Sequence, residues 1–454
     1  MHSATELARR IRQRERSARE ALEEHLDRIA RHDATLHAVV SVDAARARAE
    51  ADAADAALGR GEVRGPLHGV PMTLKDGNDV AGLRTTVGTR ELDRIATEDG
   101  AVAARLRAAG AVVFGHTNVA PWLADYQTAN PVFGRTANPW NPARTAGGSS
   151  GGAAAAVAAG MTPLEIASDL AGSARQPAHM CGVYGLKTTE HRVPLTGFFR
   201  IPEAPRTVRI LSTLGPLARD LDDLSLALSV IAGPDGRDGD VPAVPLAAPP
   251  RRELAGVRLA IAPTLPGMRV QQALSRQVER IGAEASRFGA RVVERLPAID
   301  WDDLHALFRD LLAAVTGLLD PTSDLRDEQR TLAWYLTALD RRDRFIAAWH
   351  DYFHDVDALV LPPATTTAFP HCDSGAAIDV DGERRSYVET GGLVAFCNLA
   401  GLPALVAPAG RDDDGLPIGV QLVGPAWSEP ALIELARALE RAGVLPGFQP
   451  PPGY

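Results

Sequence analysis

Two serine-containing loops and one lysine hold the side chains best suited to chemistry. Residues 146–152 read AGGSSGG, and residues 168–175 read SDLAGSAR with Ser173 near the centre. Only two of the 48 basic residues are lysines, Lys75 and Lys187. A lysine ammonium loses its proton when burial lowers its pKa, whereas an arginine in a protein stays charged. These residues indicate acyl transfer by a serine that a lysine activates.

The loop at 146–152 fits more than one kind of site. Its glycines lead into an alanine-rich stretch, so backbone N–H groups at a helix start could face an anion. A P-loop, however, needs Lys and Ser or Thr directly after its last glycine, and Ala153 follows here. Gly147, Ser149 and Gly151 also match G-x-S-x-G, the nucleophile elbow of α/β-hydrolases. That alternative requires a strand directly before the loop, and NPWNPART is a poor strand because of its two prolines.

The loop at 168–175 has the small residues that let a backbone approach a substrate carbonyl. Its successive N–H groups could stabilise an oxyanion, and they belong to Leu170, Ala171, Gly172 and Ser173. Ser173 remains a weak nucleophile until a base removes its proton. His179 lies close in sequence, but we favour Lys75 as the base, and expect His179 to be structural.

Helical and extended patterns alternate around these loops. Ser3 with Glu6 and Ser17 with Glu20 form capping-box patterns that open two helices. Residues 68–76 alternate apolar and polar side chains like a half-buried strand, which Lys75 ends. A further helix is expected near 43–58, before this strand. After the strand come helices near 100–109 and 152–159, strands near 111–114 and 164–167, and a polar loop at 128–152. This alternation predicts an α/β fold.

The second half of the chain repeats the alternation and adds a helical segment. We expect strands at 257–263, 358–362 and 419–424, and helices at 271–288 and 429–443. The region 302–353 is helical in pattern and rich in Leu, Trp and Tyr, which predicts an inserted cap.

The blocks GVPMTLKD, RTAGGSSGG and SDLAGSARQPAHMCGVYGLKTT resemble the successive blocks of the amidase signature family, and the similarity continues to GLPIGVQLVGP. The resemblance implies a Ser–cis-Ser–Lys triad with Ser173 as nucleophile, Ser149 as the cis-serine and Lys75 as base. It also implies oxyanion donors from Leu170 to Ser173. The residues expected to support the site are Ser150, Ser168, Asp169 and Arg175.

The same resemblance implies the architecture. We expect one amidase domain over 1–454, with a signature core at about 64–200 and a helical substrate-cap insert at about 302–353. The expected fold is a central, mostly parallel mixed sheet covered by helices on both faces. Small departures from the family pattern fall beside the nucleophile, where Ala171 could narrow the oxyanion hole and Ala174 could enlarge the pocket.

Aromatic residues near these blocks predict an apolar substrate pocket. The candidates for substrate contact are Trp122, Tyr126, Gln127, Phe198 and Phe199. We therefore expect a hydrolase of small, hydrophobic amides, with anilides, carbamates and esters as further substrate classes. The alternative is a glutaminase-type amidotransferase subunit that supplies ammonia to a tRNA-dependent partner.

Composition excludes several other classes of function. The net charge of −9 provides no basic surface for nucleic acid, and no apolar stretch approaches the roughly 20 residues of a bilayer span. The three widely spaced cysteines indicate neither a disulfide framework nor a zinc site, which fits a reducing cytoplasm. We expect no metal, no cofactor, no nucleic-acid partner and no membrane association, and we consider a homodimer as the assembly.

Overall fold

The computed structural model describes residues 1–201, 206, 208–247, 251–317 and 331–454. Its helices are α1 (Ala4–Arg12), α2 (Ala18–Leu36), α3 (Ala44–Gly59), α4 (Ala101–Ala108), α5 (Gly151–Ala158), α6 (Arg175–Cys181), α7 (Leu221–Ile231), α8 (Gln272–Arg287), α9 (Trp301–Gly317), α10 (Leu332–Tyr352), α11 (Gly392–Leu399) and α12 (Glu429–Arg441), with 3-10 turns η1 (Pro121–Leu123) and η2 (Tyr387–Gly391).

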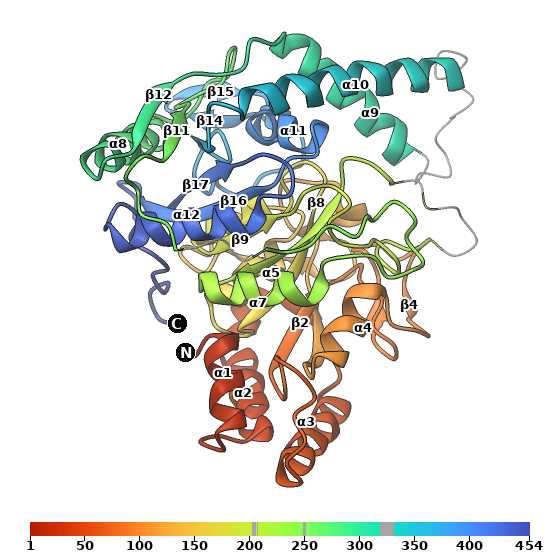
Figure 1. The fold of residues 1–454 in the computed structure, drawn as a ribbon. Helices are drawn as coiled ribbons and strands as arrows, with labels where there is room; N and C mark the ends of the chain where they lie inside the picture. Colours follow the sequence, from red (N-terminus) through yellow and green to blue (C-terminus); the bar gives the residue numbers. More distant parts are fainter. Residues whose placement is uncertain (202–205, 207, 248–250, 318–330) are drawn as a thin grey trace.

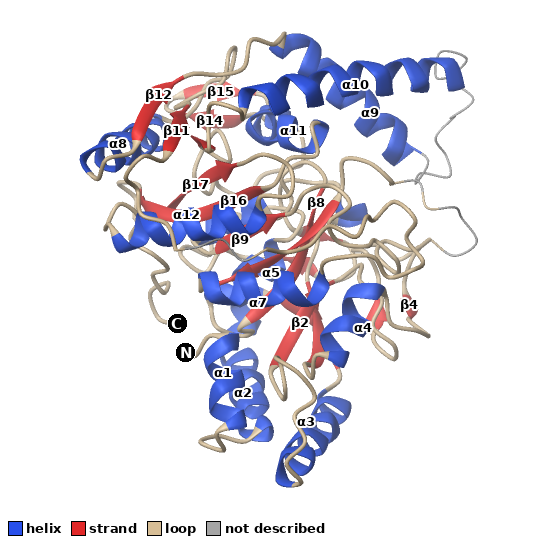
Figure 2. Cartoon of the chain, viewed as in Figure 1, coloured by secondary structure: helices blue, strands red, loops and turns tan. Residues whose placement is uncertain are grey.

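The strands are β1 (Val39–Val42), β2 (Pro71–Lys75), β3 (Arg84–Thr85), β4 (Arg94–Ile95), β5 (Val112–Thr117), β6 (Ala129–Asn130), β7 (Gly134–Arg135), β8 (Leu164–Asp169), β9 (Tyr184–Lys187), β10 (Thr213–Ala218), β11 (Arg258–Ile261), β12 (Arg291–Glu294), β13 (Ala358–Leu361), β14 (Ile378–Val380), β15 (Glu383–Arg385), β16 (Ala404–Arg411) and β17 (Pro417–Val423). Helices and strands alternate through much of the chain, which confirms the α/β prediction (Figure 2).

Among the described residues the main sheet has eight strands, in the order β12-β11-β13-β17-β16-β9-β10-β8. The expectation of a mostly parallel sheet is wrong. The pairs β11–β12 and β11–β13 are parallel, whereas the other five neighbouring pairs are antiparallel. One reason is local: residues 412–416 join β16 directly to β17, and so short a loop forces the two strands to run in opposite directions. The sheet is mixed, as expected.

Helices cover both faces of this sheet, which confirms that part of the prediction (Figure 1). The alternation of side chains along β16 shows the two layers. Leu405 and Ala407 belong to the apolar core that contains residues of α7, α8 and α12, whereas Val406 packs with residues of α5 and α6. Because α5 contains only Gly, Ala and Val, its eight residues are all buried against neighbouring elements.

The strand that ends at Lys75 belongs to a separate sheet, in the order β1-β5-β2. All five residues of β2 are buried, so the half-buried prediction is wrong. On one face Met72 and Leu74 join the core that includes residues of α1 and α2. On the other face Thr73 donates to Glu165 of β8, which places β2 against the edge of the main sheet. The polar side chains of β2 therefore face a buried protein interior.

The N-terminal helices form where the capping patterns place them. Ser17 and Glu20 make the full capping box of α2. Ser3 caps α1 through the Glu6 N–H, but the Glu6 carboxylate pairs with arginines of its own helix instead of closing the box. The helices in the described part of the chain lack the combination of length and apolar character that a bilayer crossing requires.

The region 302–353 is helical in its described residues, as α9 and α10, and residues 318–330 lie outside the description. The two helices pack with α11 at one end of the molecule (Figure 1). Trp349 of α10 stacks on Phe396 of α11 with ring centroids 4.7 Å apart. Trp334 and Tyr335 pack against the same core and do not line the cavity described below. Trp301 of α9 packs edge-on against the rings of both Trp349 and Phe396, so aromatic packing holds α9 against α10 and α11.

Candidate active site

Lys75 is fully buried at the end of β2, and its amine contacts two serine hydroxyls. The Nζ atom donates to Ser149 Oγ and to Ser168 Oγ, each at 2.8 Å. Burial in this interior lowers the pKa of Lys75 to about 7, although Asp169, Glu165 and Asp76 act in the opposite direction. A large fraction of the amine is therefore unprotonated at neutral pH and can accept a proton.

Ser149 lies in the loop that leads into α5, and its peptide bond to Gly148 is cis, as the resemblance implies. The loop is held from behind by Thr128, whose hydroxyl donates to the Gly147 carbonyl at 2.9 Å and accepts from the Gly151 N–H at 2.9 Å. Gly148 needs its missing side chain, because a Cβ would lie 2.5 Å from the Asp125 carbonyl oxygen. The glycines thus let the loop pack closely enough to bring Ser149 to Lys75.

Ser173 follows β8 and faces a cavity, with 7% of its surface exposed. The N–H of Ser150 donates to the Ser173 carbonyl at 3.2 Å, which ties the two serine loops together. Ser150 is fully buried, and its hydroxyl lies 3.5 Å from the Ser168 carbonyl oxygen. Among the described residues the Ser173 hydroxyl makes no hydrogen bond. Of Ser149, Ser150, Ser168 and Ser173 it has the largest exposed fraction, and it lines the cavity together with Ser168, so a substrate can reach it.

Asp169 and Arg175 form a buried bidentate ion pair next to Ser173. Arg175 donates from Nη2 to Oδ1 at 2.8 Å and from Nε to Oδ2 at 3.0 Å. Burial alone would raise the pKa of Asp169, but the charge and hydrogen bonds of Arg175 hold it well below its usual range. The carboxylate also accepts from the N–H groups of Gly172, Ala174 and Arg175. The pair therefore shapes the turn that carries the nucleophile candidate.

This turn narrows the expected set of oxyanion donors. The Gly172 N–H donates to Asp169 Oδ1 at 3.0 Å, and Gly172 does not line the cavity. Leu170, Ala171 and Ser173 do line it. Gly172 is needed for another reason, since its φ of +96° suits glycine and a Cβ would lie 2.8 Å from Val394. The backbone N–H groups that remain available to an oxyanion are thus those of Leu170, Ala171 and Ser173.

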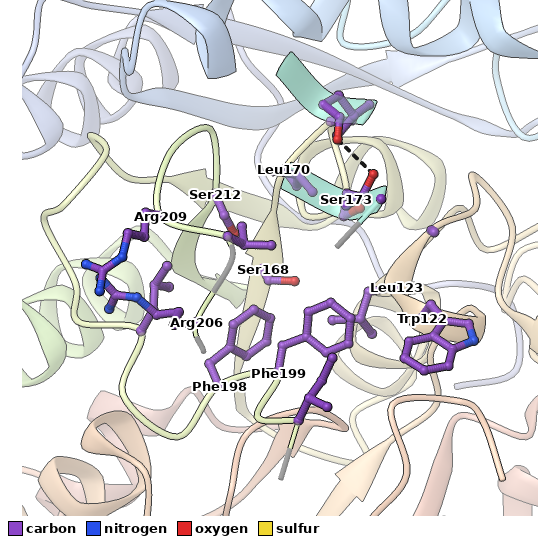
Figure 3. A pocket seen from close by; sticks show the side chains of 18 of the residues that line it. Trp122, Leu123, Ser168, Leu170, Ser173, Phe198, Phe199, Arg206, Arg209 and Ser212 are labelled. Atoms are coloured by element: carbon purple, nitrogen blue, oxygen red, sulfur yellow. Dashed lines mark hydrogen bonds between the residues drawn. The ribbon is translucent and has the colours of Figure 1, made fainter. Parts of the chain in front are cut away.

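The cavity in front of Ser173 measures about 1040 Å³ and has mostly apolar walls. The predicted contacts Trp122, Tyr126, Phe198 and Phe199 all line it. Leu312 and Thr316 of α9 contribute another part of the wall. Figure 3 shows the rings of Phe198, Phe199 and Trp122 on one side of the cavity, with Arg206 and Arg209 at the end away from Trp122. The volume suffices for an aryl or medium-chain acyl group.

Gln127 does not line the cavity, so its assignment to substrate binding is wrong. Its amide clamps a distant loop instead, donating to the Cys372 carbonyl at 2.8 Å and accepting from the Cys372 N–H at 3.2 Å. Tyr387, which no sequence pattern indicates, takes a place in the cavity wall and donates to Asp125. The prediction groups Gln127 with Tyr126 because the two are adjacent in sequence. It fails because adjacent residues in an extended loop point in different directions.

The alternative chemistries lack the contacts they need. The nearest described strand before the 146–152 loop is β7, which ends at Arg135, so the nucleophile elbow has no strand to carry it. His179 is fully buried, and both of its ring nitrogens bond to the backbone, at Thr366 and Gly419. Within the described ranges no three His, Cys, Asp or Glu side chains gather as a metal site would require.

Comparison with known proteins identifies the family. The amidase family model matches residues 20–301 and 295–433 of the chain. The chain belongs to the amidase signature family. It is 34% identical to a glutamyl-tRNA(Gln) amidotransferase subunit of Thermosynechococcus vestitus, covering 96% of this chain and 97% of that protein. It is also 34% identical to the indoleacetamide hydrolase of Bradyrhizobium diazoefficiens, covering 98% of this chain and 87% of that protein.

The fold agrees with solved structures of this amidase family. A bacterial aryl acylamidase of the amidase signature family superposes with a TM-score of 0.82 at 25% identity, and the match covers 98% of this chain and 97% of that one. Enzymes of this family hydrolyse amides, and the relatives named above carry different names: a glutamyl-tRNA(Gln) amidotransferase subunit, an indoleacetamide hydrolase and an aryl acylamidase. The substrate choice of this chain therefore depends on the residues that line its own cavity.

Proposed function

We propose that this amidase hydrolyses the C–N bond of small hydrophobic amides through an acyl-enzyme on Ser173. The observation that carries the proposal is the 2.8 Å contact between the buried Lys75 amine and Ser149, beside a cavity of aromatic and aliphatic side chains. The contact supplies a base inside the protein, and the cavity supplies a binding site for an apolar acyl or leaving group.

Acylation begins with a neutral Lys75 amine. Ser173 Oγ attacks the amide carbonyl and gives its proton to Ser149, while Ser149 passes its own proton to Lys75. A hydroxyl can carry out this relay because it both donates and accepts. The oxyanion of the tetrahedral intermediate is stabilised by the backbone N–H groups of Leu170, Ala171 and Ser173.

Collapse of the intermediate returns the proton. The Lys75 ammonium protonates the leaving nitrogen through Ser149, the C–N bond breaks, and the amine departs from the Ser173 ester. A water molecule then attacks the ester and loses its proton by the same relay, which releases the carboxylic acid and restores Ser173. The net reaction consumes one amide and one water, and uses no metal or cofactor.

A series of anilides tests the substrate class. Each methylene buried in the cavity contributes about 0.8 kcal/mol, so kcat/KM should rise about tenfold for every two methylenes from acetyl to hexanoyl. We expect benzoyl and hexanoyl anilides to exceed free glutamine as substrates. A flat series with no preference for apolar acyl groups would contradict the apolar-pocket proposal. Carbamates and esters belong in the same panel, because one acyl-transfer site serves all three groups.

The second candidate function is the glutaminase half of an amidotransferase. It is favoured by the 34% identity to the glutamyl-tRNA(Gln) amidotransferase subunit named above. Gel filtration of the purified protein with a glutaminase assay separates the two candidates. Glutamine as the best substrate, with ammonia release that depends on a partner chain, would favour the second. Activity of the isolated chain on anilides would favour the first.

We place the reaction in the cytoplasm and assign it to a single catalytic domain over 1–454. The cellular assignment rests on Cys181, Cys372 and Cys397, which are all free thiols. The partner required by the proposal is a small amide substrate alone.

A further inference from the structure

Glu165 is a buried carboxyl group without an ion-pair partner among the described residues. Its side chain on β8 is fully buried. Thr73 Oγ1 donates to it at 2.5 Å and Thr117 Oγ1 at 2.7 Å. Both partners are neutral hydroxyls, whereas buried carboxylates are ordinarily paired with a cation. Two hydroxyls in a buried interior leave the charge of Glu165 largely uncompensated.

The two threonines place this carboxyl group beside Lys75. Thr73 precedes Lys75 by two residues in β2, so both side chains point to the same face of the strand. Thr117 of β5 is the register partner of Lys75. The hydroxyls that hold Glu165 therefore flank the lysine along the strand and across the sheet.

The other charged groups around β8 have bonding partners of their own, although Asp169 and Asp76 also favour the charged form of Lys75. On the elements packed against this strand they are Asp76 after β2, His116 in β5, Asp169 at the end of β8 and Arg219 after β10, while α5 has none. Asp169 is neutralised by Arg175, and Asp76 accepts from Thr86 N–H and Oγ1. Arg219 donates to backbone carbonyls. The His116 ring bonds to the backbone carbonyl of Arg84.

We propose that Glu165 is a positioning residue for the reaction, whose carboxylate raises the proton affinity of the Lys75 amine and so keeps it able to both accept and return a proton. The proposal rests on the proposed role of Lys75 as base. A lysine bonded only to serines in a dry interior would lose its proton too readily and would be a weak base. The carboxylate offsets that tendency without contacting the substrate.

The titration behaviour of the two groups supports this arrangement. Burial raises the pKa of Glu165 to about 8, and burial lowers the pKa of Lys75 to about 7. The two pKa values lie close together, so near neutrality the two groups titrate as a coupled pair that exchanges one proton between an ionised and an uncharged form. In the ionised form the Glu165 carboxylate stabilises the Lys75 ammonium, as Asp169 and Asp76 also do. Removing the carboxylate should leave the ammonium less stable, so that Lys75 loses its proton at a lower pH.

The amino-acid composition allows this proton to be observed directly. Because the chain has only Lys75 and Lys187, lysine labelled with ¹³C at Cε gives two NMR signals. A Lys75→Arg variant assigns them. In Glu165→Gln we expect the titration midpoint of Lys75 to fall by about one pH unit, as expected for charges several Å apart at an effective dielectric near 20. The Lys187 midpoint should stay within a few tenths of a unit and serves as an internal control.

Two further variants complete the test. Asp223→Asn replaces another buried carboxyl group, which accepts hydrogen bonds from the N–H groups of Ala4 and Thr5. This control variant should leave the titration midpoint of Lys75 unchanged. Thr117→Val keeps Glu165 but removes one of its donors, so it should lower the Lys75 midpoint by a smaller amount than Glu165→Gln. If Glu165→Gln does not fold, Thr117→Val decides the question.

The pH at which kcat/KM falls on the acid side of its profile should shift by the same amount as the NMR titration midpoint of Lys75. An unchanged Lys75 midpoint in both Glu165→Gln and Thr117→Val, or an equal shift in Asp223→Asn, would overturn the proposal. These outcomes are separate from failure of the proposed function, which would appear as a wild-type enzyme inactive on amides or as an active Lys75→Arg. The NMR titration needs no turnover and remains decisive in either case.

Discussion

The pH dependence of kcat/KM follows directly from the burial of Lys75. With its pKa lowered from the ordinary value of 10.5 to about 7, the fraction of neutral amine should be about a tenth at pH 6, about half at pH 7 and about nine tenths at pH 8. The rate on a non-ionising anilide should follow this fraction, rising about tenfold per unit below pH 6, about fivefold from pH 6 to pH 7, and reaching a plateau above pH 8. A solvent-exposed lysine would instead give a rate that rises until pH 10.

Replacing Lys75 by arginine separates charge from proton transfer. Arginine keeps the positive charge beside Ser149 but has no accessible neutral form, so we expect kcat/KM to fall by at least about 10²-fold across the whole pH range. Initial rates from pH 5.5 to 10, in buffers of constant ionic strength, measure both effects. A wild-type rising limb that continues past pH 9, or substantial activity in Lys75→Arg, would refute the assignment of Lys75 as base.

Three further changes test the surroundings of the site. Lys75→Met should raise the free energy of unfolding by up to about 5 kcal/mol at pH 6 and by less as the pH approaches 10. The reason is that a lysine whose pKa is lowered in the folded state destabilises the fold at every pH below the pKa of lysine in the unfolded chain; a pH-independent difference in urea unfolding would contradict this. Asp169→Asn should cost about 3–5 kcal/mol because it leaves Arg175 buried without its charge partner, so a loss below 1 kcal/mol would be unexpected. Leu312→Trp should reduce kcat/KM for hexanoyl anilide about tenfold more than for acetyl anilide, since Leu312 lines the cavity. Equal losses for the two anilides would show that α9 does not contact the acyl group.

The sequence predicts those parts of the site that lie in contiguous motifs. Lys75 at a strand end and the two serine loops can be identified because residue type and spacing within one short segment limit the local geometry. The alanine-rich run after Gly152 likewise predicts α5. Such features depend on residues that are close together in the sequence, so the sequence alone predicts them.

Features that depend on distant segments are not predicted. Tyr387 and Leu312 enter the cavity from segments far from the serine loops, and neither has a local pattern that marks it. Gln127 is misassigned to the substrate because its partner, Cys372, is distant in sequence. The expectation of a mostly parallel sheet comes from the family resemblance and is wrong. The sequence pattern cannot correct it, because apolar periodicity reports which side of a strand is buried but not whether its neighbour is parallel.

Mass-spectrometric mapping of the residue labelled by a serine-directed fluorophosphonate tests the acyl-enzyme most directly. We expect a single adduct on Ser173 in the wild type, no adduct and no turnover in Ser173→Ala, and slow labelling of Ser173 in Ser149→Ala. Circular dichroism of each variant would establish that the fold is retained. An adduct on Ser149, together with retained activity in Ser173→Ala, would contradict the proposed mechanism and transfer the role of nucleophile to the 146–152 loop.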